Sequence, residues 1–397
     1  MMKINKWTLG LAALGLVSIP SALQAEEKLS PLQTALSSTV ISGYISTSMH
    51  WNPGTDNSAP PAYSFNEQSK QDGFNLNVVD ITIEKPLDEG TWSAGYKVEL
   101  WIGPDAVGFN SATNAAGGDL AIKQAYVSLR VPVGNGLDLK VGTFDTIIGY
   151  EVANAGSNPN YSRSYGYTME PTQHNGILGS YQVNKTIGLT AGVANTKNSG
   201  LSTPRATTAE SFKSYMGAIT LTAPDSFGFA AGSSLSFGIV TGEDAAALNG
   251  IATSATSSPL NAIATSYYIG GTFNTPVKGL KVGTSYDYGH IPVQALALER
   301  ASAEAFALYV SYQASEKLTL HARGEYFRTN PPTLDAGPDN QVLAITGTVQ
   351  YNLWANVISR LEIRWDHSTA GSAGQPHPFN DSDKNAFLVA ANIIYKF

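Results

Sequence analysis

Charged side chains recur at every second position in two segments near the end of the chain. The two runs are His321, Arg323 and Glu325, and Arg360, Glu362 and Arg364. A spacing of two places side chains on the same face of a β-strand, so each run presents a row of charges to one side. Rows of charge beside a water-filled passage select ions by sign. Electrostatic selection is therefore the chemistry that these residues could perform.

Motifs of catalysis and cofactor binding do not occur in the sequence. There is no G-x-S-x-G, no P-loop, no dinucleotide fingerprint and, among six His, no H-E-x-x-H. The chain has no cysteine, which excludes disulfides and thiolate metal sites. We expect no enzymatic activity, no cofactor and no metal site.

The composition fits neither a charged cytosolic enzyme nor a helical membrane protein. Of 397 residues, 14% are charged, whereas an average soluble domain has roughly 25%. A polytopic helical protein would need several apolar runs of about 20 residues, and only one shorter apolar stretch stands out, at the N-terminus. The formal net charge of -7 argues against a nucleic-acid partner.

Alternation of apolar and polar residues predicts sixteen β-strands along the chain. Ala94, Tyr96 and Val98 share one face, for example, while Lys97 and Glu99 take the other. Most segments have 9–13 residues, a length that suits a tilted strand crossing a bilayer. The segments are 40–51, 74–85, 91–102, 119–131, 137–145, 176–183, 187–195, 212–223, 229–241, 264–274, 280–289, 303–313, 318–329, 341–351, 357–367 and 385–397.

The connections between these segments alternate strictly in length. Seven have three to five residues, and the eight between them have 11 to 30. Short periplasmic turns and long extracellular loops, with both termini in the periplasm, are typical of an outer-membrane barrel. We predict an all-β fold, a transmembrane antiparallel β-barrel of about 16 strands that occupies residues 40–397.

The apolar face of every strand should point outward. In hydrocarbon each backbone polar group must be paired, so a strand structure there closes on itself, with one face toward lipid and one toward the lumen. An Arg or Lys on the lipid side near the midplane costs about 2–4 kcal/mol. The charged rows therefore face a lumen, and a barrel of this size is too wide for side chains alone to fill.

The first 25 residues are typical of an export signal. Lys3 and Lys6 precede a short apolar stretch, and Ala25 offers a cleavage site before Glu26. Residues 26–39 would then form a short periplasmic N-terminal segment, either as a tail or as a small plug in the barrel. This predicts a protein of the outer membrane of a Gram-negative bacterium, exported through the periplasm.

Several motifs resemble those of a known family. The chain ends in Tyr395 and Phe397, like the assembly signal of outer-membrane barrels. The segments 143–151, 158–165 and 171–176 resemble the β-barrel porin family of the OmpL-like type. This resemblance implies an outer-membrane channel that passes small solutes and whose C-terminus is read by the barrel assembly machinery.

Residues 146–175 form the longest predicted loop, the third of the long ones. In general porins the third loop folds into the barrel and narrows it, so the resemblance implies a constriction loop here. Its many tyrosines could pack against a wall, and it carries Glu151, Arg163, Glu170 and His174. The alternative is a structured cap over the mouth.

Charged residues on the inward phase and on this loop are the candidate pore-lining and constriction residues. We expect Arg323, Arg360 and Arg364 to face loop acids, chiefly Glu151 and Glu170, across the lumen. Alternatively, the charges form ion pairs that only brace the wall. The candidates are Lys97, Glu99, Lys140, Asp145, Glu151, Arg163, Glu170, His174, His321, Arg323, Glu325, Arg360, Glu362 and Arg364.

The expected function is passive diffusion of small hydrophilic solutes and ions through a water-filled channel. The alternatives are an adhesin or structural barrel whose loops bind a partner and, with less support, a barrel hydrolase. Outer-membrane lipid, the barrel assembly machinery and the solutes are the expected partners. A homotrimer is compatible with the sequence, but all outward faces are similarly apolar and none marks an interface.

Overall fold

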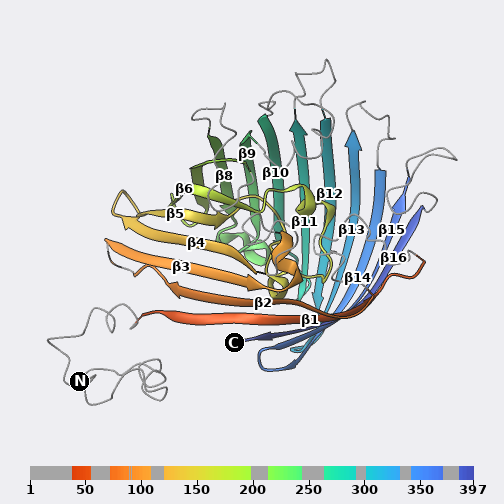
Figure 1. Ribbon diagram of the computed structural model, residues 1–397. Helices are drawn as coiled ribbons and strands as arrows, with labels where there is room; N and C mark the ends of the chain where they lie inside the picture. The colour runs from red at the N-terminus through yellow and green to blue at the C-terminus, as the bar shows by residue number, and fades with distance from the viewer. Residues whose placement is uncertain are drawn as a thin grey trace, which may run out of the picture.

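The computed structural model describes residues 38–54, 72–88, 90, 92–108, 120–197, 213–243, 263–291, 301–330, 341–369 and 384–397. The described residues form sixteen antiparallel strands in one closed barrel (Figure 1). The strands are β1 Val40–Trp51, β2 Gly73–Lys85, β3 Ser93–Ile102, β4 Leu120–Val131, β5 Leu137–Asp145, β6 Gln173–Gln182, β7 Ile187–Ala194, β8 Ser214–Thr222, β9 Ser234–Glu243, β10 Ile263–Asn274, β11 Leu280–Ile291, β12 Ala301–Gln313, β13 Leu318–Asn330, β14 Gln341–Trp354, β15 Val357–Ser368 and β16 Asn385–Lys396.

Each strand pairs with its neighbours in sequence, and the first pairs with the last. Ile45 lies opposite Tyr395, and Trp51 lies opposite Val389. The backbone N–H and C=O groups of Gly43 and Phe397 exchange two hydrogen bonds of 3.0 Å. The predicted sixteen-stranded antiparallel barrel is therefore confirmed, and because it closes, it leaves no unpaired sheet edge.

The two faces of the strands differ as alternation predicts. On β14 and β15, Ile345 and Ile363 are each 58% exposed, whereas their neighbours Thr346 and Arg364 are fully buried. In a membrane, exposed aliphatic side chains on the outer wall face lipid. The two charged rows, His321, Arg323 and Glu325 on β13 and Arg360, Glu362 and Arg364 on β15, point inward, as the cost of a charge in lipid requires.

Strand boundaries deviate from prediction by a few residues, most of all at β9. The predicted strand starts at residue 229, but a 3-10 helix, η3 (Asp225–Ala230), occupies this position. Gly228 and Gly232 have φ values of 61° and 76°, a backbone conformation that alternation cannot reveal. β6 starts at Gln173, three residues early, so the preceding connection is residues 146–172.

The described parts of the connections contain three further short helices: η1 (Pro104–Gly108), η2 (Ala155–Ser157) and α4 (Tyr165–Met169). None of the helices in the described part of the chain is long and apolar enough to span a membrane. The predicted signal peptide and most of the predicted periplasmic segment lie outside the described residues, so both stay predictions.

Candidate functional site

The connection between β5 and β6, residues 146–172, lies inside the barrel, and we call it the inner loop. Figure 1 shows this yellow-green segment within the ring of strands. Its hydrogen bonds reach inward-facing residues on the opposite wall, far away in sequence. The Tyr161 hydroxyl donates to Ser48 on β1 (2.9 Å), and Asn160 donates to Thr348 on β14 (2.7 Å). The inner loop thus crosses the lumen instead of capping the mouth.

Arg323 on β13 is the centre of the attachment. Its side chain is fully buried and donates to Glu151 of the inner loop at 2.8 Å and to Glu325 at 2.6 Å. It also donates to the backbone carbonyl of Ser162 at 2.8 Å. A guanidinium presents five N–H donors in a fixed plane, so one side chain can bind two carboxylates and a carbonyl at once. Arg323 therefore joins the wall to two separate parts of the inner loop.

Two arginines on β15 bind the inner loop through its backbone. Arg360 donates to the carbonyls of Ala155 (2.9 Å) and Asn158 (2.5 Å). Arg364 donates to the carbonyl of Arg163 at 2.6 Å and is held by its ion pair with Asp366, at 2.7 Å. These arginines satisfy carbonyls that a buried loop would otherwise leave unpaired.

Acidic wall residues satisfy the N–H groups of the same segment. Glu362 accepts from the backbone N–H groups of Tyr161 and Ser162 at 2.6 and 2.8 Å. Glu325 accepts from the N–H of Tyr165 at 2.8 Å. Because the alternating charges meet carbonyls and N–H groups in turn, the irregular backbone of the inner loop can be buried without a large desolvation penalty.

Helix α4 is held in place by its N-cap residue, Ser164, and by its first residue, Tyr165. The hydroxyl of Ser164 caps the helix by accepting from the N–H of Tyr167. The ring of Tyr165 stacks on Phe327 of β13 with a centroid separation of 4.7 Å, and its hydroxyl donates to Asp366 at 2.9 Å. Burial raises the pKa of Tyr165 well above its usual range, so this phenol remains a neutral donor.

The start of the inner loop is attached by apolar contacts. Ile148 is buried in a cluster that includes Leu178, Met216 and Val240 from β6, β8 and β9. Tyr150 stacks on Tyr309 of β12 at 4.1 Å, and its hydroxyl accepts from Thr272 at 3.1 Å. The hydroxyl is close to Gly283, where an added Cβ would lie 1.9 Å from the oxygen. The ring therefore fits only because residue 283 is glycine.

Glu170, at the end of α4, has a different environment. Its carboxyl group contacts that of Asp287 on β11, and both residues are buried. Burial raises the pKa of Glu170 well above its usual range, and the Asp287 carboxyl raises it further. Two acids in contact are compatible with burial when they share a proton. This contact thus resembles a hydrogen bond between an acid and a carboxylate.

Part of the inner wall remains partly exposed to water. On β3 to β5, Lys97, Tyr126, Lys140 and Asp145 are partly exposed. Lys97 pairs with Glu99 at 3.0 Å, and the Lys140 ammonium lies 4.8 Å from the centre of the Tyr126 ring. On β6 to β9 the inward row contains hydroxyl side chains and glycines, including Ser180, Thr190, Thr220 and Ser236. The part of β6 to β9 that the apolar cluster around Ile148 does not occupy is polar and has short side chains, as a wetted passage requires.

The predicted pore-lining residues divide into two groups. The four that remain partly exposed are Lys97, Lys140, Asp145 and His321. The other ten are buried, mainly between wall and inner loop, so they cannot line open water as predicted: Glu99, Glu151, Arg163, Glu170, His174, Arg323, Glu325, Arg360, Glu362 and Arg364. The expected opposition of arginines and loop acids holds only for Arg323 with Glu151. Arg360 and Arg364 bind carbonyls, and Glu170 contacts another acid.

Two functional contacts were missed by sequence reasoning. Asp287 lies on the predicted inward phase of its strand, but nothing in the sequence indicates that it meets Glu170. Lys123 bridges two acids, with its ammonium 3.2 Å from Glu99 and 2.5 Å from Asp145. Lys123 is the extra residue of a β-bulge, and nothing in the sequence indicates that its inward side chain bridges these two acids.

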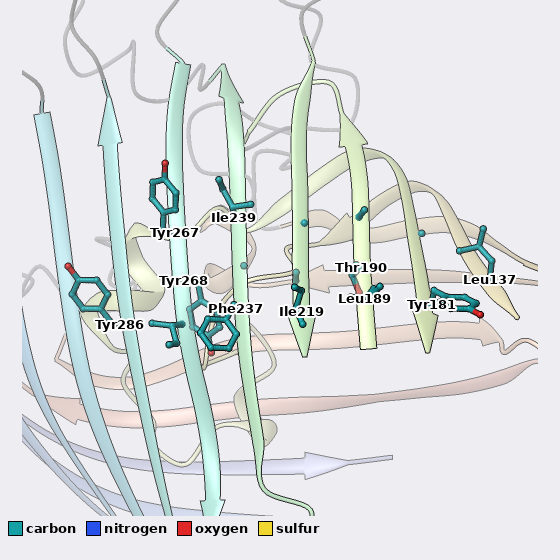
Figure 2. A pocket seen from close by; sticks show the side chains of 16 residues that line it. Leu137, Tyr181, Leu189, Thr190, Ile219, Phe237, Ile239, Tyr267, Tyr268 and Tyr286 are labelled. Atoms are coloured by element: carbon teal, nitrogen blue, oxygen red, sulfur yellow. The ribbon is translucent and has the colours of Figure 1, made fainter. Parts of the chain in front are cut away.

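The outer wall has a shallow apolar depression on β5 to β11, of about 790 Å³ (Figure 2). Three small outward residues, Gly179, Ala191 and Gly217, lie side by side across β6 to β8 and form its floor. Larger side chains such as Tyr181, Ile219 and Tyr267 surround it. The depression faces away from the lumen and is separate from the inner loop.

The fold and the sequence both have known counterparts. The family model described as "Putative beta-barrel porin-2, OmpL-like" matches residues 38–397. Among solved structures, Pseudomonas putida OprB has a TM-score of 0.60 at 10% identity, covering 92% of this chain and 96% of its own. OmpF of Salmonella typhi has a TM-score of 0.59 at 9% identity, covering 90% and 97%. The anion-selective porin from Comamonas acidovorans has 0.56 at 13%, covering 91% and 99%. No curated protein sequence matches the chain significantly.

Proposed function

The chain belongs to the OmpL-like beta-barrel porin-2 family, and on this premise we propose that the inner loop is the constriction that limits passage through an outer-membrane porin. A closed barrel of sixteen strands is wide enough to enclose an aqueous channel. Solutes move through such a channel by passive diffusion, and the narrowest section decides which of them pass. No residue has to form a covalent bond with the solute.

The observation that carries this proposal is the attachment of the inner loop at many points across the lumen. Arg323, Arg360 and Arg364 fix it to β13 and β15, and Ile148 fixes it to β6–β9. A segment held this way keeps its position while solutes pass. It supports a channel of fixed width, bounded by the inner loop and by the polar residues of β3 to β9 that the inner loop leaves partly exposed.

The same proposal includes export of the chain, its assembly in the outer membrane and its oligomeric state. The export signal would be removed after residue 25, and the C-terminal Tyr395 and Phe397 would be read by the barrel assembly machinery. Both side chains are 48% exposed on the outer face of β16 and just beyond its end, where a binding partner could reach them. One similar structure is described as a trimer form of Vibrio cholerae OmpT, which supports a homotrimer for this chain.

Planar-bilayer recording of the purified barrel tests the proposed function. We expect stable, ohmic single-channel currents in potassium chloride. Replacing residues 153–168 by a short Gly-Ser linker should increase the conductance and admit larger sugars in liposome swelling. A conducting barrel whose conductance and size limit do not change on this replacement would refute the constriction. A barrel that folds but does not conduct would favour the structural or adhesin alternative.

A further inference from the structure

Burial removes more acidic than basic side chains from contact with lumenal water. Among the described residues, the buried side chains include nine acids and six bases. Three of these acids are compensated locally: Glu151 and Glu325 pair with Arg323, and Glu362 accepts two backbone N–H groups. A carboxylate neutralised and covered in this way contributes little to the potential that a passing ion experiences.

Among the lumenal charges that stay partly or fully exposed, basic side chains outnumber acidic ones. Within the described part of the chain, five bases and three acids face the lumen without being buried. The bases are Lys97, Arg130, Lys140, Lys281 and Lys396, and the acids are Glu84, Asp138 and Asp145. Arg130 and Asp138 neutralise each other through a two-point contact of 2.6 and 2.7 Å. Asp145 binds the buried ammonium of Lys123.

Lys140 is the most distinctive of the exposed bases. It projects inward from the middle of β5, beside Ser128 on β4 and Leu178 on β6. Within the described residues its contact is the face of the Tyr126 ring, and no carboxylate lies within salt-bridge distance. The aromatic face holds the ammonium in place, while Asp145 and Glu84 act on its charge without a direct ion pair in the described part of the chain. Such a group attracts anions.

We infer that the passage favours small anions over cations, and that Lys140, on the uncovered wall opposite the inner loop, is the main residue that sets this preference. The inference deepens the proposed function and rests on it, because it requires water to reach this wall. The formal net charge of the chain, -7, has the other sign. However, selection takes place in the narrow section, where only the charges in contact with water act. Inorganic anions and short carboxylates are the ligand class that this wall fits.

Two substitutions of opposite sign provide the test. Reversal potentials in a potassium chloride gradient give the ratio of chloride to potassium permeability, which we expect to exceed one for the natural chain. A unit charge at roughly 7 Å in water changes the local concentration of a monovalent ion about two- to threefold. Lys140→Gln should therefore lower the ratio at least two- to threefold, and Glu84→Gln should raise it by a similar factor.

Lys278→Glu is the control, because Lys278 is exposed on the turn between β10 and β11, away from the narrow section. It should leave the ratio unchanged. Cation preference in a barrel that conducts normally would overturn the inference while the proposed function stands. A ratio above one that Lys140→Gln does not lower would overturn the assignment to Lys140. Absence of current would refute the proposed function, and the inference with it.

Discussion

Replacing Arg323 by methionine should loosen the inner loop and leave the barrel closed. The side chain is fully buried and contacts Glu151, Glu325 and the carbonyl of Ser162. Methionine preserves much of the volume but removes every donor. Glu151 then loses its cation, whereas Glu325 keeps Arg364 at 3.8 Å and still accepts from the N–H of Tyr165.

Removing one partner of a buried ion pair typically costs about 3–5 kcal/mol, because the remaining charge is buried and unpaired. Inner-loop release exposes Glu151 to water and relieves this cost, so the penalty acts on the attachment of the loop. An energy of this size shifts the equilibrium toward the detached state by a factor of roughly 10² to 4 × 10³. Backbone pairing of β13 with β12 and β14 does not depend on the side chain of Arg323, and we expect the barrel to persist.

Single-channel recording is the assay, with folding monitored by the heat-dependent mobility of the barrel in gel electrophoresis. Arg323→Met should produce larger mean currents and frequent transitions between current levels. Arg130→Met is a matched control, since Arg130 is an inward arginine that pairs with the wall residue Asp138 and not with the inner loop. A folded Arg323→Met barrel with natural conductance and noise would refute the role of this arginine as the attachment of the constriction.

Three further predictions concern the contact of Tyr150 with Gly283, the contact of Glu170 with Asp287, and the lipid-facing surface of the barrel. Gly283→Ala should displace the Tyr150 ring and increase current noise, at a cost of about 1 kcal/mol for the lost hydrogen bond. Raising the pH through the elevated pKa of Glu170 should loosen the inner loop and increase current noise. The stabilisation that depends on the Glu170 proton exists at low pH and is lost above that pKa. Glu170→Gln should abolish this pH dependence of the current noise. Ile345→Lys should lower the unfolding free energy in lipid vesicles by about 2–4 kcal/mol, measured by denaturant titration.

Each of these predictions has its own control. Gly347→Ala should be silent, because an added Cβ there meets no atom within 4 Å. For the acid pair, Asp287→Asn should also remove the pH dependence of the current noise. Noise that still depends steeply on pH in both Glu170→Gln and Asp287→Asn would contradict the shared proton. Thr220→Lys, on the partly exposed inward face of β8, should cost much less than Ile345→Lys. Equal losses for these two lysines would contradict the assignment of faces.

The fold is readable from the sequence because lipid and water impose a strict alternation on every strand. Ile345, Ile363 and Tyr395 are outward where the pattern places them, and Arg364 is inward. The pattern fails where the backbone departs from regular pairing, as at Gly228 or at the bulge beside Lys123. Such departures depend on single residues and leave little trace in a periodic signal.

For the candidate site, the sequence predicts the orientation of the charged side chains but not their contact partners. Alternation identifies Arg360 and Arg364 as inward charges, but their partners on the inner loop are backbone carbonyls, which every sequence contains. Those partners lie about 200 positions away, and no local spacing relates the two. The contact of Glu170 with Asp287 is hidden in the same way. Sequence therefore predicts which way a charge points, and tertiary packing decides whether water reaches it.

Cysteine accessibility tests the central claim most directly, since the chain contains no cysteine of its own. Thr220 and Ile219 are neighbours on β8, and the first faces the lumen while the second is 47% exposed on the outer wall. In lipid vesicles, a charged water-soluble thiol reagent should label Thr220→Cys and reduce its conductance, whereas Ile219→Cys should not react. Rapid labelling of Ile219→Cys together with protection of Thr220→Cys would contradict a barrel with lipid outside and a hydrated channel within.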